Sequence, residues 1–235
     1  MSADTDFSFA KQAATFDRHI NDSIRGYDQL RQDCIGFSQY FIQKNTTVLD
    51  IGCSSGELLR TIRDQNQKRF SSVKYLGLDI EDEFKDQWYL KRARNVSFRK
   101  QDVTKFMGYK NLSVVYSLFT LQFLPEAERL PLVKKIYKGL KDGGAFILSE
   151  KVTAKNGKFQ DMLSFMYYDF KKQKFSEKEI MDKEKSIRDQ MHLWTEYKLF
   201  EMLRAAGFVS SHMQLFWRNH LFIGILAVKA AKYRD

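Results

Sequence analysis

A glycine-bounded turn that follows a short apolar run is the feature that most constrains the fold of this chain. The run at 48–51 carries Asp50 near its end and leads into a turn that is bounded by Gly52 and Gly56. Because glycine has no Cβ, such a turn lets the backbone come close to a ligand. A strand that passes through glycines into a helix indicates an α/β nucleotide-binding domain, whose ligand lies beyond the carboxyl ends of the strands.

The rest of the chain alternates apolar runs with amphipathic segments. The runs predict parallel strands at 47–51, 74–80, 95–100, 113–118 and 145–149. Helical spacing predicts helices at 35–43, 56–65, 126–140 and 195–206. The last two runs, 209–216 and 222–229, predict a hairpin. We therefore expect an α/β fold of the class I methyltransferase, Rossmann-like type: a mostly parallel seven-stranded sheet with a C-terminal antiparallel hairpin and helices on both faces.

Two segments lie outside this alternation and predict additions to the sheet domain. Residues 1–45 are polar with scattered aromatic residues, and we expect them to form an N-terminal helical cap over the cofactor. Residues 46–235 form the expected cofactor-binding domain. Within it, the charged and aromatic stretch at about 155–195 predicts a helical insertion outside the sheet.

Acidic residues end the first three predicted strands. Asp50, Asp79 and Asp102 would therefore meet at the carboxyl edge of the sheet. A carboxylate at the end of the second strand is suited to accept both hydroxyls of a ribose, and a helix start offers N–H groups to ligand oxygens. Ser54 occupies the middle glycine position of the dinucleotide pattern G-x-G-x-x-G, which disfavours NAD or flavin. The pattern favours S-adenosylmethionine (SAM), or its products S-adenosylhomocysteine (SAH) or carboxy-SAM.

Composition excludes several classes of protein. The chain has 235 residues, 43% of them hydrophobic, and contains no apolar run long enough to span a membrane. Cys34, Cys53 and four scattered histidines provide neither a disulfide framework nor a metal site. Cys53 is expected to be a small side chain that fits the turn. We expect a soluble cytoplasmic protein, and the net charge of +10 leaves nucleic acid open as a partner.

The second half of the chain resembles the carboxy-S-adenosylmethionine synthases of tRNA wobble-uridine modification. The matching residues are those at 119–124, 135–140, 143–145, 148–151, 169–171, Ser176, Glu177, Glu179, Ile180 and Lys183. Ser23 and the pair Gly26 and Tyr27 match the N-terminal segment of the family, whose tyrosine covers the cofactor. The resemblance spans about residues 16–229 and is strongest over 117–184.

The resemblance implies a homodimer with a class I methyltransferase fold that uses SAM and prephenate. A carboxyl group from prephenate ends on the methyl carbon of SAM, and a second enzyme uses the product to carboxymethylate uridine in tRNA. The implied SAM contacts are Tyr27, Gly52, Cys53, Ser54, Asp79, Ile80, Asp102 and Val103. We also predict cofactor contacts from Asp50, Gly56, Ser117 and Leu118.

This chain departs from the family pattern at positions that concern the carboxylate. Glu184 stands where the family has an arginine that grips the carboxylate, and an acid there would repel an anionic donor. Leu118 replaces a family asparagine. Lys183, Lys185 or Arg188 could take over carboxylate binding. Arg188 also lies four residues after Glu184, a spacing that an ordinary helical ion pair explains equally well.

Three functions stay open on these grounds. Methyl transfer from SAM to a small molecule or a nucleic acid is slightly favoured, because Glu184 implies that no carboxylate needs to be bound. Carboxy-SAM synthesis is the alternative, and a non-catalytic SAM-binding protein is the third. Tyr27, Arg188 and Tyr168 are the candidate catalytic residues, and His19 is a further candidate pocket group.

Overall fold

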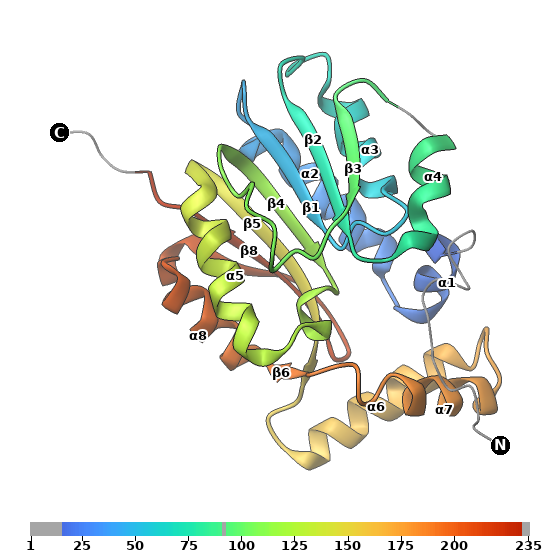
Figure 1. Ribbon diagram of the computed structural model, residues 1–235. Helices are drawn as coiled ribbons and strands as arrows, with labels where there is room; N and C mark the ends of the chain where they lie inside the picture. The colour runs from blue at the N-terminus through green and yellow to red at the C-terminus, as the bar shows by residue number, and fades with distance from the viewer. Residues whose placement is uncertain (1–15, 91–92, 232–235) are drawn as a thin grey trace.

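The computed structural model describes residues 16–231 except 91 and 92; the N-terminal part of the predicted cap lies outside the described residues. A twisted sheet forms the centre, with helices packed on both faces (Figure 1). The strand order is β3-β2-β1-β4-β5-β8-β7, and a two-residue strand, β6 (Trp194–Thr195), pairs with β5 off this path. The seven strands of the path are β1 (Thr47–Ile51), β2 (Lys74–Asp79), β3 (Val96–Lys100), β4 (Leu112–Leu118), β5 (Leu140–Thr153), β7 (Met213–Asn219) and β8 (Phe222–Val228).

Strand pairing confirms the predicted fold class. Strands β1 to β5 pair with one another in parallel, whereas β8 runs antiparallel to both β5 and β7. The C-terminal hairpin therefore closes one edge of an otherwise parallel sheet. The strand order changes direction between β1 and β4, at the centre of the sheet. The carboxyl ends of β1, β2 and β4 lie together there, and open α/β sheets bind their ligands at this point.

Two hydrophobic layers hold the helices to the sheet. Successive residues of a strand point to opposite faces, so Val114 joins one layer and Val115 the other. One layer packs under α5 (Glu126–Gly139) and α8 (Glu196–Ala206), and the other under α2 (Tyr27–Phe41) and α3 (Glu57–Asn66). Burial on both faces explains why the central strands read as continuous apolar runs.

Further helices lie outside these layers. Figure 1 shows α6 (Gly157–Lys171) and α7 (Glu177–Ser186) beyond one end of the sheet, as the charged stretch at 155–195 predicts. Helix α7 begins with a capping box, in which Ser176 and Glu179 exchange hydrogen bonds. The short helix α1 (Phe16–Ser23) precedes α2. No helix in the described part of the chain is both long and apolar enough to cross a membrane.

The structure corrects several predicted boundaries. Helix α2 begins at Tyr27, not at residue 35. The prediction missed the first half of the helix because that half is mostly polar, and only Tyr27 and Leu30 carry the apolar period there. The six-residue helix α4 (Lys85–Leu90) was not predicted. Strand β5 is longer than the predicted run at 145–149, and β7 starts later because residues Ser210–His212 form a 3₁₀ turn.

Candidate functional site

A cavity of about 840 Å³ opens at the carboxyl ends of β1, β2 and β4. Most residues that were predicted to contact the cofactor line it: Tyr27, Asp50, Gly52, Cys53, Ser54, Asp79, Ile80, Asp102, Val103 and Leu118. Gly56, Ser117, Tyr168 and Arg188 do not belong to its lining. Gly56 precedes α3 and Ser117 is fully buried within β4, whereas Tyr168 packs on Tyr167 and Arg188 is exposed.

The glycine turn after β1 leaves no space for a side chain. Gly52 has a φ of 71°, and a Cβ added there would lie 2.1 Å from Oγ1 of Thr120. The N–H groups of Gly52 and Cys53 both donate to the carbonyl of Leu78 in β2, at 2.8 and 3.0 Å. The turn is thus fixed against the neighbouring strand. Burial raises the pKa of the Cys53 thiol, which fits a small side chain that fills the turn rather than a reactive thiolate.

Asp79 and Asp102 are oriented by the backbone of the loops that follow their strands. Oδ2 of Asp79 accepts from the N–H of Ser54 at 2.7 Å, and Oδ1 accepts from the N–H of Glu81 at 3.0 Å. Oδ1 of Asp102 accepts from the N–H and hydroxyl of Thr104, and the hydroxyl bond holds the pKa of Asp102 below its usual value. The first of these contacts ties the second strand to the glycine turn, so that both face one ligand.

The buried carboxyl group of Asp50 indicates a positively charged ligand. Its carboxyl is only 3% exposed, and burial together with the charge of Asp79 raises its pKa to about 8. Two neighbouring buried carboxyls are stabilised in the ionised form when a cation lies beside them. SAM carries an ammonium and a sulfonium group, and its ribose and adenine are uncharged. The residues at this end of the cavity therefore fit SAM.

The opposite end of the same cavity is basic. Lys151 from β5, Lys183 from α7 and His19 from α1 line it. Nζ of Lys183 lies 2.6 Å from Nε2 of His19, and Nζ of Lys151 lies 3.4 Å from Oε2 of Glu184. Lys171 is 4.0 Å from the other oxygen of Glu184. The lining thus combines carboxyl groups at the ends of β1 and β2, which form the acidic end, with lysines from β5 and α7, which form the basic end.

Glu184 is turned away from the residue expected to pair with it. Its two oxygens face Lys151 and Lys171, and no ion pair joins it to Arg188 within the part of the chain that the structure describes. Glu184, Lys185 and Arg188 are absent from the cavity lining, whereas Lys183 belongs to it. Of the three cations that could replace the family arginine, the structure brings only Lys183 to the cavity.

Aromatic side chains also line the cavity. The ring of Tyr27 lies 6.1 Å from that of Phe119, which in turn contacts Phe222 with ring centroids 5.8 Å apart. Phe119 has a φ of 58°, a left-handed conformation that is uncommon for a residue with a Cβ. Sequence reasoning placed Phe119 in a motif without assigning it to the site, because its backbone conformation leaves no mark in the sequence.

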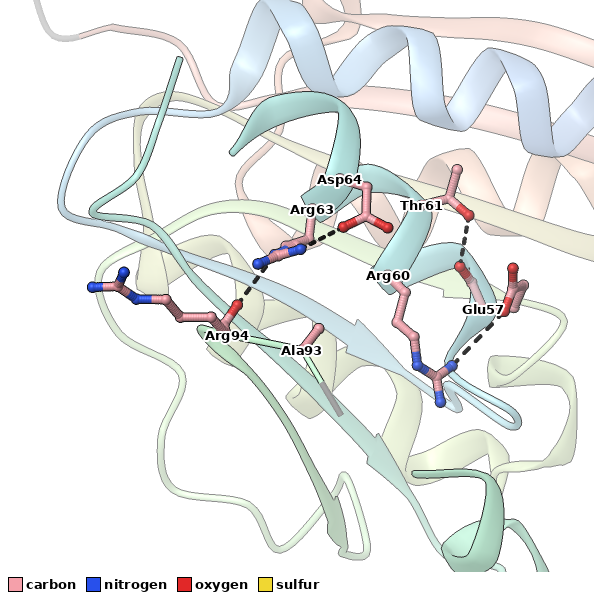
Figure 2. Close-up of a pocket in the computed structure, with 7 residues that line it drawn as sticks. All are labelled: Glu57, Arg60, Thr61, Arg63, Asp64, Ala93 and Arg94. Carbon is pink, nitrogen blue, oxygen red and sulfur yellow. Dashed lines mark hydrogen bonds and ion pairs between the residues drawn. The ribbon is translucent and has the colours of Figure 1, made fainter. Parts of the chain in front are cut away.

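A second hollow, shown in Figure 2, lies on the surface beside α3 and the loop before β3. Two of its three arginines are already engaged: Arg63 bonds Asp64 and the carbonyl of Arg94, and Arg60 donates to the carbonyls of Ser55 and Gln87. None of the predicted cofactor residues lines it. The site is therefore the cavity at the strand ends.

The fold and this cavity define a class I SAM-dependent methyltransferase fold. Residues 49–146 match the family model described as "Methyltransferase domain". Among solved structures, human N-acetylserotonin methyltransferase in complex with SAM superposes with a TM-score of 0.60 at 15% identity, over 94% of this chain and 55% of that one. A chain of the complex between the Haloferax volcanii Trm112 methyltransferase activator and a putative methyltransferase gives a TM-score of 0.64 at 15% identity, over 95% and 98%.

Relatives in sequence define the family more narrowly. A carboxy-S-adenosyl-L-methionine synthase from Staphylococcus epidermidis is 31% identical over 95% of this chain and 96% of its own length. One from Shewanella baltica is 31% identical over 96% and 93%. The chain belongs to the carboxy-S-adenosyl-L-methionine synthase family. The resemblance is thereby confirmed, and with it the class of SAM-dependent enzyme.

Proposed function

We propose that this chain transfers a carboxyl group from a carboxylate donor of the prephenate type to SAM, forming carboxy-SAM. The observation that carries this proposal is the division of one cavity into an acidic end, with Asp50 and Asp79, and a basic end, with Lys151 and Lys183. Methyl transfer needs a site for a cationic cofactor and a neutral or nucleophilic acceptor. Carboxyl transfer needs a cation and an anion held side by side, which is the charge arrangement of this cavity.

At the acidic end, the side chains have separate roles toward SAM. Asp79 accepts hydrogen bonds from the ribose hydroxyls, and the ionised carboxylate of Asp50 attracts the ammonium group. Gly52 has no Cβ, which would meet Thr120, so the turn can pack against the loop after β4 at the wall of the cavity. Prephenate would lose carbon dioxide and a hydroxide ion as its ring becomes aromatic. The hydroxide would take a proton from the sulfonium methyl group of SAM and leave as water, and the methyl carbon would then bond the carbon dioxide. Orientation of the two ligands at close distance provides much of the rate.

In this proposal, helices α1 and α2, which form the described part of the predicted cap, exclude water from the cavity. Within the described part of the cap, Ile20, Ser23, Ile24 and Tyr27 line the cavity. Tyr27 is 7% exposed and packs on Phe119. Exclusion of water strengthens the attraction between opposed charges and protects a reactive carbon from unwanted proton transfer. The cap and the loop that contains Phe119 thus close the central part of the cavity.

The departure at Glu184 favours methyl transfer on sequence grounds, and its surroundings weaken that argument. Glu184 faces two lysines rather than the cavity, so its charge is largely offset where a donor would bind. Lys151 and Lys183 remain on the wall. We therefore place carboxy-SAM synthesis before methyl transfer. A homodimer and a role in tRNA wobble-uridine modification are further proposals that rest on family membership.

Incubation of the full chain with SAM, with and without prephenate, tests the proposal by mass spectrometry of the nucleoside products. We expect a product heavier than SAM by carbon dioxide only when prephenate is present. SAH formed only with added tRNA or cell extract would contradict the proposal and select methyl transfer. Asp79→Ala serves as the control, since loss of its hydrogen bonds to the ribose should abolish product by weakening SAM binding.

A further inference from the structure

The turns that lead into the five parallel strands carry exposed positive charge. We infer that this amino-terminal edge of the sheet, at the opposite end from the cavity, is a docking surface for the phosphate backbone of RNA. The cations of this amino-edge surface are Lys44 before β1, Lys74 at the start of β2, Arg94 before β3, Lys110 before β4 and Lys141 near the start of β5. The inference does not depend on which reaction the cavity catalyses.

The topology of the sheet brings these cations together. They are scattered between residues 44 and 141 of the sequence, but their strands are parallel neighbours in the order β3-β2-β1-β4-β5. The amino ends of such strands share one edge, which Figure 1 shows away from α6 and α7. Since neighbouring strands lie about 4.8 Å apart, the row of cations spans roughly 20 Å. That length covers several successive phosphates of a nucleic acid.

Asparagine-containing turns fix the shape of the edge. Asn45, Asn95 and Asn111 directly follow three of the cations, and each has a positive φ, between 53° and 64°. Nδ2 of Asn111 donates to the carbonyl of Asn45 at 2.7 Å, and the N–H of Asn45 donates to Oγ of Ser72 at 3.1 Å. Nδ2 of Asn95 donates to the carbonyl of Ser71 at 2.9 Å. The turns before four neighbouring strands are thus bonded to one another, so a ligand orders little additional backbone when it binds.

The protein does not neutralise this row of cations. Among the described residues, no acid forms an ion pair with any of the five. Asp142 is the acid in these turns, and its Oδ1 lies 4.0 Å from Nζ of Lys229. Asp64, beside Arg94 in the hollow of Figure 2, bonds Arg63 at 2.6 Å. Further exposed cations flank the row: Lys68, Arg69 and Lys138. The surplus of positive charge attracts a polyanion, whose binding releases counterions.

The side chains between the cations favour RNA over a membrane. No large apolar side chain is exposed among the described residues of these turns, and insertion into lipid needs such side chains. Their exposed uncharged side chains are mainly amides and hydroxyls: Asn45, Ser71, Ser72, Asn95 and Asn111. These groups both donate and accept hydrogen bonds, so they suit the 2′-hydroxyl groups that distinguish RNA from DNA.

The position of the surface separates docking from catalysis. The cavity opens at the carboxyl ends of β1, β2 and β4, whereas the amino-edge surface lies where the strands begin. At about 3.3 Å per residue, strands of five to seven residues hold the two sites roughly 15–25 Å apart. RNA on this surface leaves the cavity open to SAM. It therefore localises the enzyme rather than serving as the acceptor of a transferred group.

Fluorescence anisotropy of a labelled RNA hairpin, titrated with the full chain, tests the surface. With about five phosphate contacts, log Kd should rise by about 4 to 5 for a tenfold increase in KCl. The triple variant Lys44→Gln, Lys110→Gln, Lys141→Gln should weaken binding at least about tenfold and reduce this slope by about 3, because each lysine accounts for about one unit. Its SAH affinity, melting midpoint and product formation from SAM should equal those of the native chain.

The matched control is the triple variant Lys155→Gln, Lys158→Gln, Lys174→Gln. It removes the same charge from exposed lysines on or beside α6, beyond the other end of the sheet, and should change RNA affinity less than about twofold. The inference is overturned if the folded amino-edge variant binds RNA with native affinity and salt dependence, or if the control variant weakens binding equally. Displacement of the RNA by SAH would place RNA in the cavity and also overturn it. A DNA hairpin of the same sequence that binds as tightly would overturn the assignment to RNA.

Discussion

Burial shifts two residues of the cavity toward the same pKa from opposite directions. It raises the pKa of Asp50 to about 8, with a contribution from Asp79, and it lowers the pKa of Lys183 to about 8, with a contribution from Lys171. Each residue is thus near its point of titration at physiological pH in the ligand-free protein. A ligand of opposite charge would return each group to its ionised form.

The change Asp50→Asn tests this arrangement at the acidic end. In the native protein, SAM affinity should gain an increasing contribution from Asp50 between about pH 6 and pH 8, because ionised Asp50 binds the cation and the neutral acid does not. Asparagine cannot ionise, so the variant should lose this contribution and bind SAM about tenfold more weakly at pH 8. Calorimetry of both proteins over this range provides the measurement.

The informative quantity is the difference in SAM affinity between the native protein and Asp50→Asn at each pH, because titration of the amino group of SAM affects both proteins equally. Parallel pH profiles would show that Asp50 does not titrate against the ligand.

Single residues of the site were predictable where local chemistry reveals them. Gly52, Asp50 and Asp79 were predicted because a turn and two strand ends mark them in the sequence, and all three line the cavity. The pairing of Lys183 with His19 was not predictable, since 164 positions separate the two residues and only the folded chain brings α1 to α7. The helical spacing between Glu184 and Arg188 suggested a pair that long-range contacts with Lys151 and Lys171 replace.

At the scale of elements, the loop after β4 depends on a buried acid in β5. The carboxyl group of Glu150 accepts hydrogen bonds from the N–H groups of Leu121 and Gln122, at 2.9 and 2.8 Å. The side-chain oxygen of Gln122 accepts from the N–H of Lys151 at 2.8 Å. Arg129 from α5 donates to the carbonyls of Gln122 and Leu124. This set of bonds fixes the loop that presents Phe119 and Thr120 to the cavity.

Glu150→Gln should loosen this loop. An amide has one oxygen, so its NH₂ group would face one of the two N–H donors and leave it unsatisfied. We expect a loss of about 1–3 kcal/mol in the free energy of unfolding and a weaker affinity for SAM. Urea denaturation and calorimetry measure the two effects. Stability equal to that of the native chain would show that the carboxylate does not hold the loop.

Elements with a strong internal pattern were predicted, and elements that depend on their neighbours were not. The central strands are recognisable because both of their faces are buried. Helix α4 has only six residues, and it is placed by the Trp88 side chain, whose Nε1 donates to the carbonyl of Ser54 at 2.8 Å. Ser54 lies 34 positions before Trp88 in the chain, so no local sequence pattern predicts this contact.

At the scale of the whole molecule, the sheet and its additions contribute opposite charges to one cavity. The carboxyl ends of β1 and β2 supply Asp50 and Asp79, whereas β5, α7 and α1 supply Lys151, Lys183 and His19. The sheet topology follows from the alternation of strands and helices in the sequence. The basic end depends on how α1 and α7 pack beyond the end of the sheet. This packing explains why Lys183 could be named only as one of several candidates and why Lys151 was not named as one.

The stability of the ligand-free molecule should fall as the pH rises from about 6.5 to 8. Asp50 and Glu150 both have pKa values raised by burial to about 8, so the folded state binds more protons than the unfolded state in this range. The protonated form of such a carboxyl group stabilises the folded state, and this stabilisation decreases as the pH approaches the pKa of the group in the folded protein. The expected loss in the free energy of unfolding over this range is about 1.5 kcal/mol per group. His19 affects the pH dependence of stability only below pH 6.5, and Lys183 affects it only above about pH 8.

Thermal melting of the native chain should therefore show a midpoint that falls as the pH rises from about 6.5 to 8, and Asp50→Asn should reduce this fall. Added SAM should also reduce the fall, because it favours the ionised form of Asp50. A midpoint that stays constant or rises from pH 6.5 to 8 would contradict the assignment of buried, protonated carboxyls to the ligand-free state.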